Sequence, residues 1–319
     1  MGTLFLVQIP ETAGSNLRLA ACRLWGSGKI VTDYGPSNRH TSESVLELIH
    51  LEQDFHGFKT WLSEQEIALF TSHAPLRSMR RIFPASDIIT FLRHPVDLIL
   101  QRYQSALLGG YKGGLIQFAT LRVHRDIQSR FLRTVPLELL GFVGLSERFT
   151  ESLTLLNEQY GCNLTALTVQ DNVCNNALSE LSDVTEADRS KLAELNAQDM
   201  ELYATATELF DTRITLQEQQ TPYVHGRVHK LNENSIEGWA VPAQSSEPCK
   251  IRLHINQECV AILPASEYLP ALKERNVSRD GYVGFSHQFK QRLKRKDEVS
   301  CYIHCSEQLL TGPRRVNTK

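Results

Sequence analysis

The sequence lacks any run of about 20 apolar residues, so it predicts no membrane-spanning helix. It also lacks an excess of basic residues, because 34 Lys and Arg stand against 36 Asp and Glu. This balance argues against a nucleic-acid-binding protein, which depends on a strongly basic surface. No basic residues precede the apolar segment 3–9, so no signal peptide is expected and a cytoplasmic location is predicted.

Cysteine is sparse, with seven residues in 319 and no pair at Cys-x-x-Cys spacing. The sequence therefore contains neither a typical zinc motif nor a redox motif, and no metal site is predicted. Reduced, partly buried thiols of a cytoplasmic protein are the expected state of these residues. Cys301 and Cys305 have the same parity as Val299 and Ile303, which predicts that all four lie on one face of a strand.

A chain of 319 residues is too long for one small core and suggests about two domains. Before residue 220, short apolar runs alternate with amphipathic helical patterns. The expected buried strands are 3–9 and 87–92, and a later apolar run spans 137–144; the expected helices are 16–25, 96–108, 147–160 and 185–210. This alternation predicts an α/β domain over residues 1–220, with a mainly parallel sheet flanked by helices.

After residue 220 the apolar residues recur at every second position, as in Ile251, Leu253 and Ile255. Turn signals separate these runs, which predicts a small all-β sandwich domain over residues 221–319. The polar segment 217–222 ends in proline and is expected to join the two domains. The basic run Lys290–Lys296 is expected to be a solvated strand end or loop rather than a patch for an acidic polymer.

The most informative segment is the apolar stretch Leu4–Ile9 and the eight residues that follow it. The pattern predicts a buried strand, a tight turn, and a helix that begins within a few residues. Ala13 and Gly14 are small enough for the backbone to approach a ligand closely, and Thr12 and Ser15 carry hydroxyl groups. Oriented N–H groups at a helix start, together with the helix dipole, bind phosphate or sulfate. The candidate anion-binding residues are Pro10, Thr12, Ala13, Gly14, Ser15 and Asn16.

This segment resembles the 5′-phosphosulfate loop of carbohydrate-type sulfotransferases, whose usual form is I-P-K-T-[AG]-G-[TS]. Three later segments are similar to further motifs of that family: Ile89–Asp97 to T-F-L-R-D-P-V-E, Gly141–Phe149 to F-V-G-L-T-E-R-F, and Gln198–Tyr203 to the closing D-x-x-L-Y helix. The resemblance covers the first domain only. It implies a P-loop-like fold that binds 3′-phosphoadenosine 5′-phosphosulfate as the sulfuryl donor and needs no metal.

The chain departs from the family pattern in the loop, where Glu11 replaces the lysine that stabilises the leaving phosphate. At ~4 Å and an effective dielectric constant near 20, one unit charge is worth about 4 kcal/mol, roughly a thousandfold in rate. Gln101 replaces a serine that binds the 3′-phosphate, although its amide can still donate a hydrogen bond. His94 replaces an aspartate, which is a milder change. The side chains that could restore the lost positive charge are Arg18, Arg102 and Lys112.

The resemblance also implies a general base and further donor contacts. Phe70–Pro75 is similar to the family's G-H-x-x-Y segment, which assigns His73 to the removal of the acceptor proton; a structural histidine before Pro75 is the alternative. Arg93 is assigned to the 3′-phosphate, which a guanidinium binds well, and an ion pair with Asp97 is the competing role. The segment 126–130 resembles N-x-x-[TS]-R, which assigns Ser129 and Arg130 to the donor nucleotide.

The sequence thus predicts an enzyme, a sulfotransferase whose acceptor is a hydroxyl, on a bacterial glycan or a related metabolite. A degenerate, non-catalytic protein that binds a nucleotide or glycan is the alternative, because of Glu11 and Gln101. The second domain resembles a β-sandwich module appended to bacterial glycan-modifying enzymes, through segments 226–228, 238–242 and 281–285. Its Trp239 is expected in the core, and a glycan-binding scaffold is a third possibility for the chain. No residue pattern identifies the acceptor.

Overall fold

A computed structural model describes residues 2–79, 82–133, 135–166, 184–243, 245 and 247–315. The chain forms two compact units, which consist of Met1–Phe83 with Asp87–Phe210 and of Pro84–Ser86 with Asp211–Lys319. The division falls within one helix, α9 (Ala197–Glu218). Each unit is therefore described by itself.

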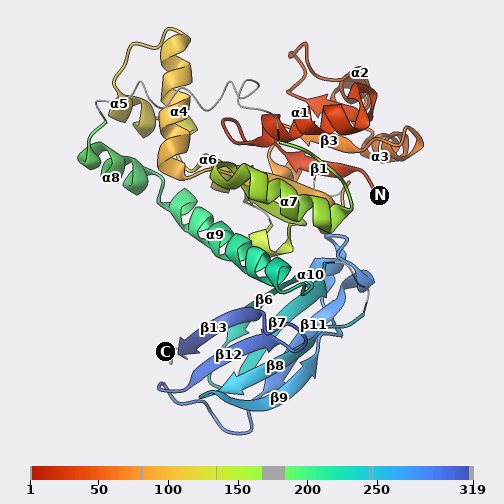
Figure 1. The fold of residues 1–319 in the computed structure, drawn as a ribbon, viewed down its shortest axis with the longest axis vertical. Helices are drawn as coiled ribbons and strands as arrows, with labels where there is room; N and C mark the ends of the chain where they lie inside the picture. The colour runs from red at the N-terminus through yellow and green to blue at the C-terminus, as the bar shows by residue number, and fades with distance from the viewer. Residues whose placement is uncertain are drawn as a thin grey trace. The chain divides into compact units, whose positions relative to one another are not determined.

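The first unit contains a five-stranded parallel sheet in the order β2-β3-β1-β4-β5, with helices around it (Figure 1). Its strands are β1 Leu4–Val7, β2 Ile30–Asp33, β3 Leu69–Ser72, β4 Ile88–Leu92 and β5 Phe142–Leu145. Every residue of β1, β3, β4 and β5 is buried, as expected of apolar strands that are covered on both faces. The α/β fold predicted for this part of the chain is confirmed at this level.

The helices of the first unit follow the strands along the chain. The α-helices are α1 Gly14–Trp25, α2 Glu43–Val45, α3 Phe55–Glu64, α4 Pro95–Leu108, α5 Leu115–Thr120, α6 Ile127–Leu132, α7 Phe149–Tyr160, α8 Glu186–Leu195 and the start of α9. A π-helix, η2, spans Leu46–Leu51. The short 3₁₀ turns are η1 Ser27–Lys29, η3 Leu76–Ser78, η5 Arg122–His124, η6 Leu137–Leu139 and η7 Ser146–Arg148. A further turn, η4 Ala85–Asp87, belongs to the second unit except for its last residue.

The prediction of one helix over 185–210 is wrong, because α8 and α9 are separate helices. Asn196 ends α8 in a non-helical conformation, and its side-chain nitrogen donates to the carbonyl oxygen of Leu192 at 2.9 Å. The same side chain accepts a hydrogen bond from the backbone N–H of Asp126 at 2.9 Å. A tertiary contact therefore breaks the helical pattern, and α9 then continues through the segment 217–218 that had been expected to be a linker.

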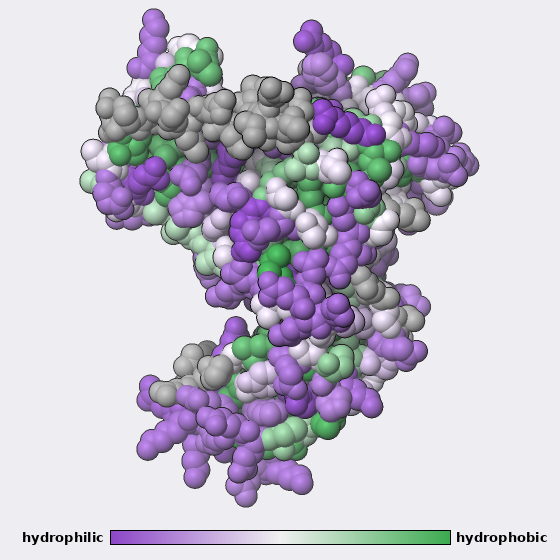
Figure 2. All heavy atoms as spheres, in the orientation of Figure 1, coloured by the Kyte–Doolittle hydropathy of each residue, from purple (hydrophilic) through white to green (hydrophobic). Residues whose placement is uncertain are grey.

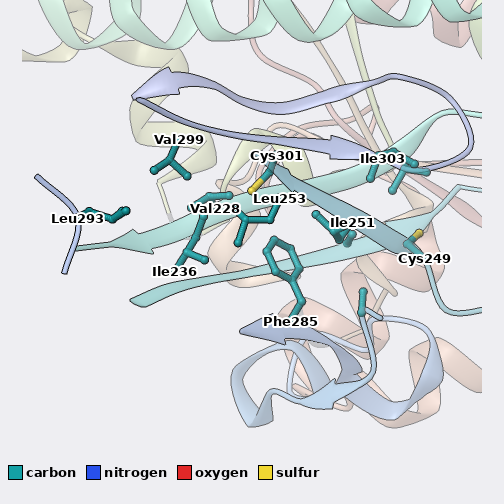
Figure 3. Close-up of a cluster of buried hydrophobic side chains, with 13 residues drawn as sticks. Val228, Ile236, Cys249, Ile251, Leu253, Phe285, Leu293, Val299, Cys301 and Ile303 are labelled. Carbon is teal, nitrogen blue, oxygen red and sulfur yellow. The ribbon is translucent and has the colours of Figure 1, made fainter. Parts of the chain in front are cut away.

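The second unit contains two four-stranded antiparallel sheets, ordered β10-β11-β7-β6 and β13-β12-β8-β9. Its elements are β6 Val224–Leu231, β7 Ser235–Pro242, β8 Lys250–Ile255, β9 Glu258–Pro264, β10 Glu267–Tyr268, α10 Pro270–Lys273, η10 Arg279–Gly281, β11 Tyr282–Gln288, β12 Glu298–Ile303 and β13 Leu309–Arg315. Both sheets contribute to one apolar core, in which Phe285 of β11 and Leu253 of β8 take part (Figure 3). The predicted all-β domain is confirmed, and Trp239 is buried as expected.

The surface and the cysteines of the second unit follow from this packing. Hydrophilic residues predominate on the face of the unit that Figure 2 shows, since the apolar faces of the sheets are turned inward. Val299, Cys301 and Ile303 share the buried face of β12, as predicted, but Cys305 does not. Cys305 lies in an exposed turn, because the N–H of Ile303 bonds to the carbonyl of Gln308 at 2.8 Å and ends the strand. Among the described helices, none is both long and apolar enough to cross a membrane.

Candidate anion-binding site at the carboxyl edge of the parallel sheet

The loop between β1 and α1 is fixed by the buried side chain of Gln8. Its Nε2 donates to Ser15 Oγ at 2.9 Å, and its Oε1 accepts from Thr71 Oγ1 at 2.8 Å and from the Tyr34 hydroxyl at 3.4 Å. The hydroxyl of Ser15 is thus used as an acceptor, which leaves its proton for a ligand. Gln8 therefore orients a donor at the first turn of α1.

The start of α1 has no side-chain cap, and the small residues there are needed for packing. A Cβ atom on Gly14 would come within 2.9 Å of Gln8 Cγ, so glycine lets the helix approach the strand. The N–H of Ala13 donates to Ser146 Oγ at 3.0 Å, and Thr12 Oγ1 donates to the carbonyl of Ile9 at 2.8 Å. In the part of the chain that is described, the N–H groups of Gly14 and Ser15 have no hydrogen-bond partner, as is usual in a first helical turn. Pro10 and Asn16 flank these residues and are half-buried.

Glu11 lies in this loop with a positive φ of 66°, a conformation that is uncommon for residues other than glycine. Its Oε1 accepts a hydrogen bond from Ser105 Oγ of α4 at 3.2 Å. Of the three cations that could replace the loop lysine, Arg102 of α4 interacts electrostatically with Glu11. The charge of Arg18 acts on Tyr34, and Lys112 is exposed.

Arg93 follows β4, the parallel neighbour of β1, and therefore emerges beside the loop. Val7 of β1 pairs with Thr90 of β4, and Pro10 and Arg93 each lie three residues after this pair. Neighbouring strands are about 4.8 Å apart. The loop and Arg93 thus share the carboxyl edge of the sheet, where open α/β sheets bind ligands.

The backbone of Arg93 is held by Gln128, a fully buried residue at the start of α6. Gln128 Oε1 accepts from the Arg93 N–H at 2.9 Å, and Gln128 Nε2 donates to the Arg93 carbonyl at 2.9 Å. Asp199 of α9 in turn accepts from the N–H groups of Gln128 at 3.0 Å and Ser129 at 2.7 Å. Burial raises the pKa of Asp199, and its hydrogen bonds with Ser129 and Gln128 act in the opposite direction.

The next residue, His94, is held by side chains from the segments 141–149 and 198–203. Its N–H donates to Glu147 Oε1 at 2.7 Å, and the Tyr203 hydroxyl donates to Glu147 Oε2 at 3.1 Å. Burial first, and then the negative charge of Glu147, raise the pKa of Tyr203, which keeps this hydroxyl a donor. The turn after β4 is thus fixed by three segments that are distant in sequence.

The competing role proposed for Arg93, an ion pair with Asp97, is not what the structure has. Asp97 lies 3.3 Å from Arg189 Nη1 and 3.8 Å from His94 Nδ1. Within the described residues, the Arg93 guanidinium has neither a hydrogen bond nor an ion pair. A cation with a fixed backbone and no internal partner is well suited to an anionic ligand.

The remaining predicted donor contacts lie close to Arg93 but are already engaged or buried. Ser129 uses its hydroxyl and its N–H on Asp199. Arg130 is exposed, and its guanidinium donates to the carbonyl oxygens of Arg122 at 2.9 Å and Val123 at 2.8 Å. Gln101 is only 5% exposed, and its Oε1 has no partner in the described structure. Ser129 is therefore a support of the site in this structure, whereas Arg130 keeps a charge that no carboxylate neutralises among the residues described.

His73 directly follows β3, on the other side of β1. Its N–H donates to the carbonyl of Asp33 at 2.9 Å, and its ring meets the Tyr34 ring edge-on at 4.5 Å between centroids. Nε2 is buried and has no partner among the described residues. Burial lowers the pKa of His73, and Asp33 opposes this effect, so the ring is an uncharged proton acceptor at neutral pH.

A second histidine, His50, belongs to a cluster that the sequence did not reveal. Asp33 ends β2 and is 2% exposed; its Oδ1 lies 2.9 Å from His50 Nε2, and its Oδ2 accepts from Ser72 Oγ at 3.0 Å. His50 comes from the π-helix η2, a feature that is frequent at functional sites. A carboxylate that orients an imidazole is a usual arrangement for a base. The only sequence signal was the aspartate at the end of a short apolar run, since the pairing of Asp33 with Ser72 depends on strand order.

Within the described residues, no group of three or more His, Cys, Asp or Glu side chains could hold a metal ion. Comparisons with protein-family models, with curated proteins and with solved structures found no match to the chain. The interpretation of the site therefore depends on its own geometry and on the motifs that the sequence carries.

Proposed function

We propose that the first unit is P-loop-like, binds 3′-phosphoadenosine 5′-phosphosulfate and transfers its sulfuryl group to a hydroxyl, most naturally that of a glycan. The observation that carries the proposal is the pairing of β1 with β4, which sets an uncapped helix start on the strand next to Arg93. The guanidinium of Arg93 has no partner among the described residues. Two anion-binding elements at one edge suit a ligand that has phosphate groups at two positions. The N–H groups of Gly14 and Ser15 would bind the 5′-phosphosulfate, and Arg93 the 3′-phosphate.

The reaction would be a direct displacement at sulfur. The acceptor oxygen forms a bond to sulfur, and the bond from sulfur to the bridging oxygen breaks. The electron pair stays on the 5′-phosphate, so the products are a sulfate ester and 3′-phosphoadenosine 5′-phosphate. Fixed N–H donors would stabilise the charge that develops on the leaving phosphate.

The acceptor proton would pass to an imidazole on the β2–β3 side of the loop. His73 is the residue that the resemblance assigns, and its lowered pKa keeps it neutral. His50 is the alternative, because Asp33 holds it and its side chain is 23% exposed, whereas His73 Nε2 is buried. Replacement of each by glutamine would separate them: the base is the residue whose loss removes turnover while donor affinity stays the same.

Isothermal calorimetry with 3′-phosphoadenosine 5′-phosphate tests the binding step. The wild-type chain should bind, and Arg93→Gln should weaken binding by at least about tenfold, since a charge-assisted bond to phosphate contributes about 1.5–3 kcal/mol. Lys59→Gln, which removes an exposed charge from α3, is the control and should have no effect. An absence of binding at millimolar ligand would refute the proposal.

A second candidate function is a sulfotransferase-like protein that binds the nucleotide or a glycan without turnover. Glu11 favours this candidate, because a carboxylate in the loop opposes the charge of the leaving phosphate. Sulfate transfer from labelled donor, compared between wild type and Glu11→Lys, distinguishes the two. A large gain in the variant would indicate a site that has lost catalysis, and a loss would show that Glu11 itself contributes to turnover.

A further inference from the structure

Two arginine side chains, Arg102 of α4 and Arg130 of α6, both contact the 3₁₀ turn η5, Arg102 through His124 and Arg130 through backbone carbonyl oxygens. Burial lowers the pKa of Arg102; the charge of Glu11 opposes this shift, and that of Arg130 adds to it. The Arg130 guanidinium is fixed by two backbone carbonyl oxygens, at 2.9 and 2.8 Å. These bonds orient its charge but do not neutralise it.

Arg102 is held in place without using all its donors. Its Nη2 lies 3.5 Å from His124 Nδ1, and its Nε is buried with no hydrogen-bond partner among the residues described. His124 stacks on Phe118, with ring centroids 3.7 Å apart. Burial lowers the pKa of His124, and the charges of Arg102 and Arg130 lower it further, so this ring adds no third charge at neutral pH. The cluster therefore has two cations and a buried N–H group that lacks an acceptor.

Glu11 is the carboxylate that interacts with this cluster, and it is not in an ion pair. No Arg or Lys nitrogen of the described residues lies within salt-bridge distance of it, and Ser105 Oγ donates to its Oε1 at 3.2 Å. Arg102 and Ser105 are three residues apart on α4 and so share one face of the helix. Among the described residues, the loop carboxylate is thus held by a neutral hydroxyl, and its charge acts on the Arg102 guanidinium.

We propose that Arg102 and Arg130 form a binding site for a phosphate-type dianion, and that the negative charge of Glu11 weakens the binding of this ligand. Planar guanidinium groups bind phosphate oxygens in pairs, and the free Nε of Arg102 supplies a donor. A dianion would neutralise the two positive charges of Arg102 and Arg130. The charge of Glu11 then leaves the occupied site with a net charge of about −1, which disfavours binding. The identity of the ligand as a phosphate of the sulfuryl donor rests on the function proposed above; the anion site itself does not.

Calorimetry of the full chain with inorganic pyrophosphate at low ionic strength tests the site directly. Glu11→Gln should bind pyrophosphate about tenfold more tightly than wild type or better, and this gain should shrink with added salt. Arg102→Gln and Arg130→Gln should each weaken binding about tenfold. In the double variant Glu11→Gln/Arg102→Gln the gain should disappear. Lys112→Gln, which removes an exposed charge just beyond α4, should stay within about twofold of wild type.

Several results would overturn the inference. Unchanged affinity in Glu11→Gln, or equal effects of Arg102→Gln and Lys112→Gln, would show that the cluster is not the site. Thermal melting of each variant identifies any loss of binding that comes from unfolding, and a gain in Glu11→Gln cannot come from that cause. The donor analogue separates the two proposals. Pyrophosphate binding without binding of 3′-phosphoadenosine 5′-phosphate refutes the function but keeps the site, and the reverse result refutes the site alone.

Discussion

Replacement of Gln128 is the clearest test of whether its side chain holds the turn after β4 in place. Gln128→Met keeps the length of a fully buried side chain but removes both bonds to Arg93, each 2.9 Å long. The N–H and the carbonyl of Arg93 then lose their partners, and an unsatisfied buried group costs about 1–3 kcal/mol. Two such groups would cost about 2–6 kcal/mol if they were fully buried; because Arg93 is only half-buried, we expect a loss of about 2–4 kcal/mol in the free energy of opening this turn.

Hydrogen exchange measured by mass spectrometry gives this value at the turn itself. Since about 1.4 kcal/mol corresponds to a tenfold change, the Arg93 amide should exchange roughly 30- to several hundred-fold faster in Gln128→Met. Gln104→Met is the matched control, because Gln104 is 6% exposed and its amide has no hydrogen bond among the described residues. It should leave exchange at Arg93 unchanged. Equal exchange in the two variants would refute the idea that Gln128 holds Arg93.

Three further predictions concern the loop, the thiols and the pH dependence. Gly14→Ala should displace Gln8 from Ser15 and lower the melting temperature, by the equivalent of about 1–2 kcal/mol, because its Cβ would come within 2.9 Å of Gln8 Cγ. Iodoacetamide at pH 8 should modify the exposed Cys259 and Cys305 long before Cys249 and Cys301, as peptide mapping can show. Burial raises the pKa of Cys249 and Cys301 to about 12, so each has about a thousandfold less thiolate than a thiol with the ordinary pKa of 9.0. The folded-state pKa of His73 and of His124 lies below the ordinary 6.5, so the folded state binds fewer protons and the free energy of unfolding should fall as the pH drops below 6.5. In urea titrations between pH 7.5 and 5.5, His73→Gln should reduce this fall, and an unchanged dependence of the unfolding free energy on pH would contradict the prediction.

The sequence predicted those elements whose pattern is local. The buried runs of β1 and β4 and the alternation in β8 and β12 depend only on which residues are apolar, and they appear where expected. Strand order is not local, so nothing in the chain indicated that Asp33 would lie opposite Ser72. For the same reason the break at Asn196 was missed, because it depends on a contact with Asp126.

The candidate site was predictable to a similar degree. The loop and Arg93 were identified from residue types and spacing, and the structure sets them on neighbouring strands. The sequence did not show which side chains hold the backbone of Arg93 and of the segment beside it in place. Gln128 and Asp199 bind backbone groups, and a side chain that serves a backbone group far along the chain has no fixed sequence signature.

The charge around the loop, rather than its geometry, distinguishes an enzyme from a binding protein here. In the proposed function, a fixed Arg93 and an uncapped helix start would serve both, because the phosphate groups that they would hold are present before and after transfer. The leaving phosphate gains negative charge only as the bond to sulfur breaks, so interactions at that point act on the rate more than on affinity. Glu11 is the loop residue whose charge would act on the leaving phosphate, and Arg102 is the cation that interacts with Glu11. If the chain is an enzyme, Arg102→Gln should therefore lower kcat by a larger factor than it raises the Kd of the donor; equal factors would assign Arg102 to binding alone.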